Sequence, residues 1–501
     1  MINARRLIGQ AAWASCGQLA QTLLATINLI VLVRILGAEA YGIFALGLLF
    51  TGLAEVLIGG HAADIIVQRK DARSGHRNAA FNAILVVSFA STVLIVLASS
   101  AAAHMFDIPQ LRDLLLGMSV LPLLTGLASV PNQILVRRLQ FGALAKIGTI
   151  SAVLAVATGV TLASFGAGVW SLAIMEIARR SASLVMVFAA ARWWPRLHYT
   201  RSELIETVRF AMRRVENRGL SYLSQTGLPR VFIGQMLGAE ALGYFTVARR
   251  LLDQLHAVLS GPVAAVAFPA ISRLKVDSGR LSTLISSAIR LTTWVFWPAV
   301  LGIIVIAPVL MPVAFGEEWV QATPVLQLLA IGSLRTPVSS FNTAILVAFG
   351  ELRAVSLISI LSIAFCAVAL AIGANFGMSG VAAALALRQW VLWPVGATLV
   401  YRVTGFPPIR QLTVLMVAAT PSLIMAVCIY AIQRATDLAP WHALVLEVFA
   451  GVVIYAVAWS TLNRTSARQA WLAVGDLVSG DLTAAKARLD AMLSTASSIS
   501  K

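Results

Sequence analysis

The stretch "RILGAEAYGIF", from Arg34 to Phe44, is written almost unchanged a second time as "QMLGAEALGYF", from Gln235 to Phe245. A further echo follows, because "FGALAKIGTISAVL" from Phe141 is matched by "FGELRAVSLISILS" from Phe349. The offsets between matching glycines drift slowly, as loop insertions would make them: 201 residues for Gly37 and Gly238, 208 for Gly142 and Gly350, and 212 for Gly168 and Gly380. Echoes in the same order indicate an internal duplication.

The composition indicates that the duplicated unit lies in a lipid bilayer and not in water. Hydrophobic residues make up 59% of the 501 positions and charged residues 12%, with a mean hydropathy of +0.86. A soluble domain carries about 25% charged residues, so this chain lacks the charge to cover a surface in water. Uncharged runs such as Leu7–Val33 and Ala79–Ala103 exceed the roughly 20 residues that a helix needs to cross a bilayer. The alternation typical of a membrane β-barrel is missing, which favours helices.

We therefore predict an all-α polytopic membrane protein with about fourteen transmembrane helices. They are expected at residues 10–36, 41–62, 79–103, 112–135, 146–164, 168–190, 217–238, 241–266, 288–313, 320–348, 354–373, 378–402, 411–433 and 440–462. The repeat unit holds six spans. Since six is even, both copies enter the membrane from the same side, as parallel repeats do. Two bundles facing each other across a cavity are typical of alternating access.

The same pattern gives the domain boundaries. We predict a first six-helix bundle at 1–191, a basic and aromatic cytoplasmic linker at 192–204, and a second bundle at 205–403. Two additional spans follow at 404–463, and a cytoplasmic tail with a weakly amphipathic pattern at 464–501.

Loop charges predict the orientation. If the N-terminus is cytoplasmic, the outer loops hold only Arg112 and Arg434 among the 38 Lys and Arg residues. This asymmetry follows the positive-inside rule and places both termini in the cytoplasm. The net charge of +17 then reflects a basic face on anionic headgroups, so nucleic acid binding is not needed to explain it.

Charged residues inside the predicted spans are the candidate functional residues, because each costs about 2.5–3.5 kcal/mol at the centre of a lone helix. The set has eight arginines and four acids: Arg34, Arg179, Arg180, Arg230, Arg249, Arg250, Arg335, Arg388, Glu55, Glu176, Asp253 and Glu447. An excess of arginine favours a cavity for an anion over a proton relay made of acids. Arginine also suits phosphate, since its planar fork binds two oxygens at once.

Each charge also has a structural interpretation. Arg34 either lines the cavity or extends to the outer headgroups, and Glu447 is expected to hold helices together. Glu176 is expected to pair with Arg179 and Arg180 at helical spacing, and Arg250 and Asp253 share a helix face and could pair. The deepest arginines, for which function outweighs structure, are Arg249, Arg250, Arg335 and Arg388.

At this point the chain resembles the polysaccharide transport family, the Wzx-type flippases and exopolysaccharide exporters of the multidrug/oligosaccharidyl-lipid/polysaccharide superfamily. The resemblance covers about residues 1–405. It rests on motifs in a specific order: "VRILGAEAYGIF", "PNQILVRRLQFGALA", "GAGVWSLA", "IGQMLGAEALGYFTVARRL", "AFPAISRL" and "GEEWVQATPVLQLLA".

The resemblance implies that an undecaprenyl-pyrophosphate-linked, acidic oligosaccharide moves from the cytoplasmic to the periplasmic leaflet of a bacterial inner membrane. Two bundles would open in a V around a cationic cavity lined by Arg34, Arg230, Arg249, Arg250, Arg335 and Arg388. Expected partners are this substrate, membrane lipids, a polysaccharide polymerase and other assembly proteins. No cofactor or metal is implied.

Coupling to H⁺ or Na⁺ is less clearly placed. Where the family commonly carries an acid in the seventh span, this chain has Pro229 followed by Arg230. Glu55 and Asp253 then become the candidate coupling acids. Two alternatives stay open. A cation-coupled drug antiporter of the same superfamily would need a cavity richer in acids, and a membrane glycan enzyme would need paired carboxylates or a catalytic histidine in a sizeable loop.

Overall fold

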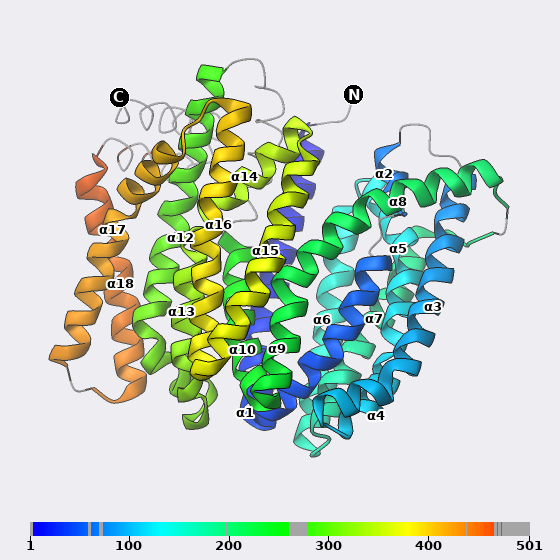
Figure 1. Cartoon of the computed structure of the whole chain (residues 1–501), viewed down its shortest axis with the longest axis horizontal. Coiled ribbons are helices and arrows are strands. Elements are labelled where there is room, and N and C mark those ends of the chain that lie inside the picture. The colour runs from blue at the N-terminus through cyan, green and yellow to red at the C-terminus, as the bar shows by residue number, and fades with distance from the viewer. Residues whose placement is uncertain are drawn as a thin grey trace. The chain divides into compact units, whose positions relative to one another are not determined.

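The computed structural model describes residues 4–58, 62–69, 74–196, 198–259, 278–436 and 438–464, together with Arg468 and Leu472. Helices make up nearly all of these residues, and none of them lies in a strand (Figure 1). The chain divides into two compact units. The first unit is Met1–Val247 with Ile363–Val381, and the second unit is Ala248–Ser362 with Ala382–Lys501.

The first unit is built on long helices that pack side by side. Its elements are α1 (Ala4–Ile58), α2 (Ile65–Gln68), α3 (Ser74–Phe106), α4 (Gln110–Met118), α5 (Val120–Arg137), α6 (Phe141–Ser164), α7 (Val169–Ala191), α8 (Arg201–Tyr222), the π-helical turn η1 (Leu223–Gly227), α9 (Leu228–Met236) and the start of α10 (Gly238–Leu259). Helix α1 packs on α6, α6 on α7, and α7 on α5, which in turn packs on α3. A short 3-10 helix, η3 (Ala374–Phe376), also belongs to this unit.

The repeated motif has one role in both of its copies. Gly37 interrupts α1 with φ 72° and ψ 179°, and Gly238 opens α10 with φ 84°. Only glycine adopts such angles without strain, so each copy makes a tight reversal between two helices. The break at Gly37 falls between the predicted spans 10–36 and 41–62.

The two copies also contact each other. A Cβ atom added at Gly42 would lie 1.7 Å from the backbone oxygen of Ala239, and one added at Gly243 would lie 1.8 Å from that of Ala38. Gly42 and Gly243 are equivalent positions 201 residues apart, as are Ala38 and Ala239, so the contact is reciprocal. Reciprocal pairing is the property of two copies related by a two-fold axis. Each copy thus supplies a glycine at the point where the other copy's backbone approaches most closely.

Helix α3 shows the inside-out pattern of a membrane protein. Its packed face carries small polar side chains, with Ser88, Ser91 and Ser99 all buried. Its outer face carries Phe89 and Leu97, which are 63% and 73% exposed. Small residues let helices approach closely in lipid, while large apolar side chains face the acyl chains.

The second unit holds the remaining helices. Its elements are α12 (Ser278–Phe315), the 3-10 helix η2 (Glu317–Ala322), α13 (Thr323–Ser333), α14 (Thr336–Phe349), α17 (Pro408–Ala435) and α18 (Pro440–Leu462). Helices α10, α15 (Leu352–Gly373) and α16 (Gly377–Thr404) continue from one unit into the other. Glu447 of α18 is buried and accepts a hydrogen bond from Gln433 of α17 at 2.9 Å, which agrees with its predicted role between helices.

The predicted span at 320–348 is interrupted in the structure. The structure replaces it with η2, α13 and α14, and the helix breaks at Leu334 and Arg335. Pro337 has no N–H group, so the carbonyl of Ser333 loses its helical donor. Tryptophan side chains satisfy two other carbonyls at the break: Trp297 donates to Leu334 at 2.9 Å and Trp390 to Ile331 at 3.1 Å.

The structure contains helices long enough to cross a membrane. Eight apolar helical stretches within the described residues are long enough to cross a bilayer. Two of them, Gly17–Ile58 and Leu352–Thr404, have 42 and 53 residues, which is enough for two crossings each. The count of fourteen stays a prediction, as do the domain boundaries.

The turn geometry changes which glycine of the second copy corresponds to Gly168. Gly168 and Gly377 both have positive φ and both lie where a helix begins, whereas Gly380 lies inside α16. Their offset is 209 residues rather than 212. The motif "AFPAISRL", the end of the predicted span 241–266 and most of the predicted tail helix lie outside the described residues.

Candidate functional site

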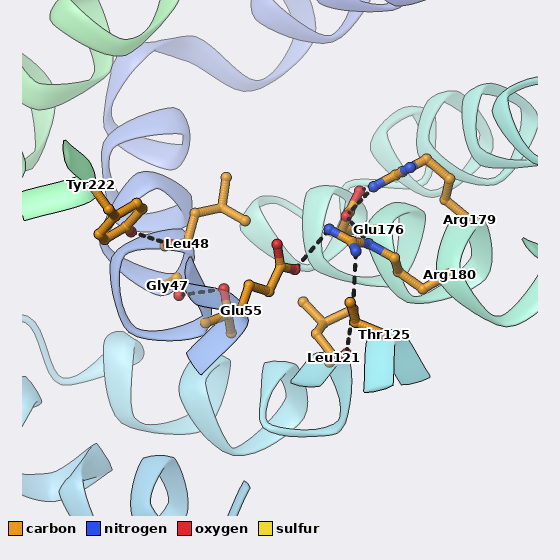
Figure 2. A network of polar contacts seen from close by, with 10 residues as sticks. Gly47, Leu48, Glu55, Leu121, Thr125, Glu176, Arg179, Arg180 and Tyr222 are labelled. Carbon is orange, nitrogen blue, oxygen red and sulfur yellow. Dashed lines mark hydrogen bonds and ion pairs between the residues drawn. The ribbon is translucent and has the colours of Figure 1, made fainter. Parts of the chain in front are cut away.

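An ionic cluster joins three helices of the first unit. Arg180 of α7 contacts the Glu55 carboxylate of α1 at 2.7 Å and donates from Nε to Glu176 Oε1 at 2.8 Å. Its third nitrogen donates to the Thr125 hydroxyl of α5 at 2.9 Å. Arg179 binds both oxygens of Glu176, at 2.8 and 2.5 Å. Figure 2 shows the carboxylate of Glu55 reaching from α1 toward Arg180.

The electrostatics of this cluster are balanced. Two carboxylates meet two guanidinium groups, so its formal charges sum to zero. All three nitrogens of Arg180 have partners, and the bidentate Arg179–Glu176 pair has the geometry of a strong charge-assisted contact. A neutral, fully hydrogen-bonded cluster is tolerated inside a membrane protein, whereas removal of one member would leave a charge unpaired. The cluster therefore cross-links α1, α5 and α7.

The structure confirms the predicted pairing of Glu176 with Arg179 and Arg180. The participation of Glu55 was missed, because it lies on a helix far away in the sequence and no spacing rule connects it to Arg180. Glu55, a candidate coupling acid, is thus held by an arginine. Any proton or cation that binds it must compete with that ion pair.

A second polar group lies next to the π-helical turn. Tyr222 donates its hydroxyl to the carbonyls of Leu49 and Leu48, at 3.0 and 3.3 Å, and its ring lies over Gly52, where an added Cβ would be 2.3 Å from the hydroxyl oxygen. Arg230 of α9 lies close enough to bond to this hydroxyl. Pro229 lacks the N–H that would continue the helix, which accounts for the irregular turn just before it. Sequence analysis named Arg230 but missed Tyr222.

Two arginines of the second unit meet at the helix break. Arg335 occupies the N-cap position of α14, and its Nε and Nη2 both donate to the amide oxygen of Gln389, at 3.0 and 2.6 Å. Arg388, on α16, is 95% buried and close enough to repel the Arg335 guanidinium. The N-terminus of α14 adds partial positive charge at the same point. An interrupted helix with cations at its break is a typical anion-binding arrangement in transporters.

Helix α10 carries the remaining candidates of this unit. Asp253 accepts from Arg249 Nε, four positions earlier, at 3.0 Å, and its predicted pairing with Arg250 stays a prediction. His256 contacts the carbonyl of Leu252 at 2.8 Å and the hydroxyl of Thr336 at 3.1 Å. Since a carbonyl only accepts, Nδ1 carries the proton and the other ring nitrogen can accept from Thr336.

The predicted cavity residues are therefore distributed as follows. Arg34, on an exposed face of α1, and Arg230 belong to the first unit, whereas Arg249, Arg250, Arg335 and Arg388 belong to the second unit. Within the second unit the structure brings Arg335 and Arg388 together. The gathering of all six into one cavity stays a prediction. Sequence analysis missed Gln389 and the buried Arg290 of α12, although Arg290 falls inside the predicted span 288–313.

The fold and these sites define a class of protein. Solved structures of multidrug transporters of the MOP superfamily share the fold. An inward-facing transporter of the MATE family matches with a TM-score of 0.60 and 18% identity over 78% of this chain and 98% of its own. An outward-facing one matches with a TM-score of 0.53 and 18% identity over 80% and 96%. The chain has the fold of a multi-pass helical membrane transporter.

The family follows from the sequence comparison. The family model described as "Polysaccharide biosynthesis protein" matches residues 31–324, and the chain belongs to this family. The succinoglycan biosynthesis transport protein ExoT of Rhizobium meliloti is 26% identical over 68% of this chain and 69% of its own. The lipopolysaccharide biosynthesis protein WzxC of Escherichia coli is 25% identical over 66% and 68%, and the teichuronic acid biosynthesis protein TuaB of Bacillus subtilis 20% identical over 69% and 72%. The chain is thus a multi-pass membrane protein of a polysaccharide biosynthesis family, with the fold of a transporter.

Proposed function

We propose that the protein moves an acidic, undecaprenyl-pyrophosphate-linked oligosaccharide from the cytoplasmic to the periplasmic leaflet of a bacterial inner membrane, by alternating access. Arg335 and Arg388, placed together at the interrupted helix, are the observation that carries this proposal. Two adjacent cations repel each other, and an anion bound near them would offset that repulsion. Pyrophosphate supplies several oxygens in the geometry that guanidinium forks prefer.

The arrangement also supports selectivity for an anion over a cationic drug. Arg335 donates both hydrogen bonds to a neutral amide oxygen, so Gln389 orients the guanidinium without cancelling its charge. A substrate phosphate can then replace or join the amide as acceptor. A cationic drug would meet two like charges at this position and be repelled.

The test uses a strain that lacks the gene and carries plasmid-borne variants. We expect Arg335→Gln and Arg388→Gln to lower polysaccharide export at least tenfold, with lipid-linked repeat units accumulating in the cytoplasmic leaflet. Arg353→Gln is the matched control, because Arg353 is an exposed arginine of the same unit. Membrane levels must be equal in all strains. Export unchanged in both cavity variants would refute the assignment, and cationic dye efflux lost in their place would favour the antiporter alternative.

Coupling to H⁺ or Na⁺ is part of the proposal. Glu55 is the better candidate of the two acids, because its protonation would break the ion pair between Glu55 of α1 and Arg180 of α7. Arg180 would keep its contacts with Glu176 and Thr125. Asp253, the second candidate, is exposed and paired with Arg249 within one helix. We expect Glu55→Gln to abolish the dependence of transport on the ion gradient. Asp253→Asn should leave that dependence in place, and the opposite result would exchange the two roles.

A further inference from the structure

A cavity with a basic lining lies in the first unit, and its arginines are not among the in-span arginines discussed above. A cavity of about 320 Å³ is lined by Ile66 of α2, Arg77 of α3, and Ile134, Arg137 and Arg138 of α5. Its volume is at the lower end of the roughly 300–1,000 Å³ usual for small-molecule sites. All three of its charged lining residues are arginines. They belong to the loops that the positive-inside rule predicts to be cytoplasmic, at headgroup level.

The charges in this cavity call for an anion. Arg137 and Arg138 both act electrostatically on Arg77, which is half-buried. Three guanidinium groups around one cavity repel each other, and a bound anion would offset that repulsion.

The arginines are also held in place before any ligand arrives. Arg137 donates from Nη1 to the carbonyls of Ile66 and Arg69, at the end of α2. Arg138 donates from Nη1 to the carbonyl of Ala191, the last residue of α7, at 2.7 Å. That contact engages one of the five N–H donors of Arg138. Cations held by helix C-termini keep their position without losing their charge, so less entropy is lost when a ligand binds.

The lining narrows the class of ligand. Arginine forks match the oxygens of a phosphate, while two isoleucine side chains form an apolar wall. A phosphodiester with an attached apolar chain would satisfy both parts of the lining, whereas a free inorganic phosphate would leave the isoleucines in contact with water. Basic pockets between helices on the cytoplasmic side of membrane proteins are suited to lipid headgroups.

We propose that the pocket formed by Ile66, Arg77, Ile134, Arg137 and Arg138 binds the phosphate group of an anionic phospholipid of the cytoplasmic leaflet. The site is separate from the proposed transport site and does not depend on the transported substrate. Its occupancy would hold α2, α3 and α5 together at the membrane surface.

The test is binding to the purified full-length protein in detergent, followed by native mass spectrometry and thermal unfolding. Phosphatidylglycerol is the probe, with phosphatidylcholine as the zwitterionic lipid and inorganic phosphate as the free anion. We expect phosphatidylglycerol to remain bound and to raise the unfolding temperature, and the two comparison ligands to do neither. Equal retention of phosphatidylcholine, or an equal effect of inorganic phosphate, would overturn the proposal.

Variants locate the site. Because hydrogen bonds to charged groups contribute about 1.5–3 kcal/mol, Arg77→Gln and Arg138→Gln should each weaken phosphatidylglycerol binding roughly tenfold to a hundredfold. Arg77→Lys, which keeps the charge but loses the fork, should lie between wild type and Arg77→Gln. The control is Arg112→Gln, an exposed arginine of α4 in a predicted outer loop. Undiminished binding in both Gln variants refutes the site, whatever the transport assays of Arg335 and Arg388 show.

Discussion

The reciprocal contact between Gly42 and Gly243 gives the sharpest prediction. An alanine at Gly42 would place a Cβ 1.7 Å from the oxygen of Ala239, and an alanine at Gly243 would place one 1.8 Å from the oxygen of Ala38. Ordinary van der Waals contact begins at 3.4 Å, so each substitution must move two backbone segments apart by more than 1.5 Å. No flexible side chain can absorb this displacement, because backbone oxygens are the atoms in the way.

The magnitude follows from two opposing effects. Overpacking a close contact costs about 1–3 kcal/mol, with backbone clashes at the upper end. Alanine in place of glycine within a helix returns about 0.5–1 kcal/mol. We expect a net destabilisation of about 2 kcal/mol for Gly42→Ala and for Gly243→Ala. One separation relieves both clashes, so the double variant should lose about 2–3 kcal/mol, well below the sum of the single variants.

Thermal unfolding of the purified protein in detergent measures these effects, at roughly 2–4 °C per kcal/mol. Gly142→Ala is the matched control, because a Cβ at Gly142 meets nothing within 4 Å and Gly142 lies in α6. It should match wild type or exceed it. The reasoning fails if the single variants behave like Gly142→Ala. The reciprocal geometry fails if the two effects simply add in the double variant.

Three further predictions concern stability and are read from the same unfolding assay. Glu176→Gln should cost about 1.5–3 kcal/mol, since Arg179 and Arg180, whose side chains are 41% and 24% exposed, lose the carboxylate that they share. An unchanged midpoint would contradict the cross-link. Trp297→Phe should cost about 1 kcal/mol, because it removes the hydrogen bond to the Leu334 carbonyl at the helix break. An unfolding midpoint equal to that of wild type would contradict this role of Trp297. At Glu206, the hydrogen bond from Arg69 lowers the carboxyl pKa, so its stabilisation is present above the unfolded-state pKa and is lost as pH falls through the lower folded value. Wild type and Glu206→Gln should differ near pH 7 and converge in acid, and a constant difference would contradict the pairing.

Several features could be predicted from the sequence because they depend on local properties. Charge-poor runs longer than a bilayer require helices in lipid, whatever their neighbours. The repeat of Leu36–Phe44 at Leu237–Phe245 predicted the duplication, and the glycine in each copy is visible in the sequence because positive φ is a property of single residues. Glu176 and Arg179 were paired correctly because helical spacing alone brings them together.

Other features depend on partners that no local rule supplies. Glu55 meets Arg180, and Arg335 meets Gln389, only because separate helices pack together. The break before Pro337 is the clearest case, because α12 stays helical through Pro298, Pro308 and Pro312. Proline alone therefore does not decide where a membrane helix breaks. The break forms where Trp297 and other side chains from neighbouring helices can satisfy the carbonyls it exposes, and in a medium without water that requirement is met only by tertiary structure.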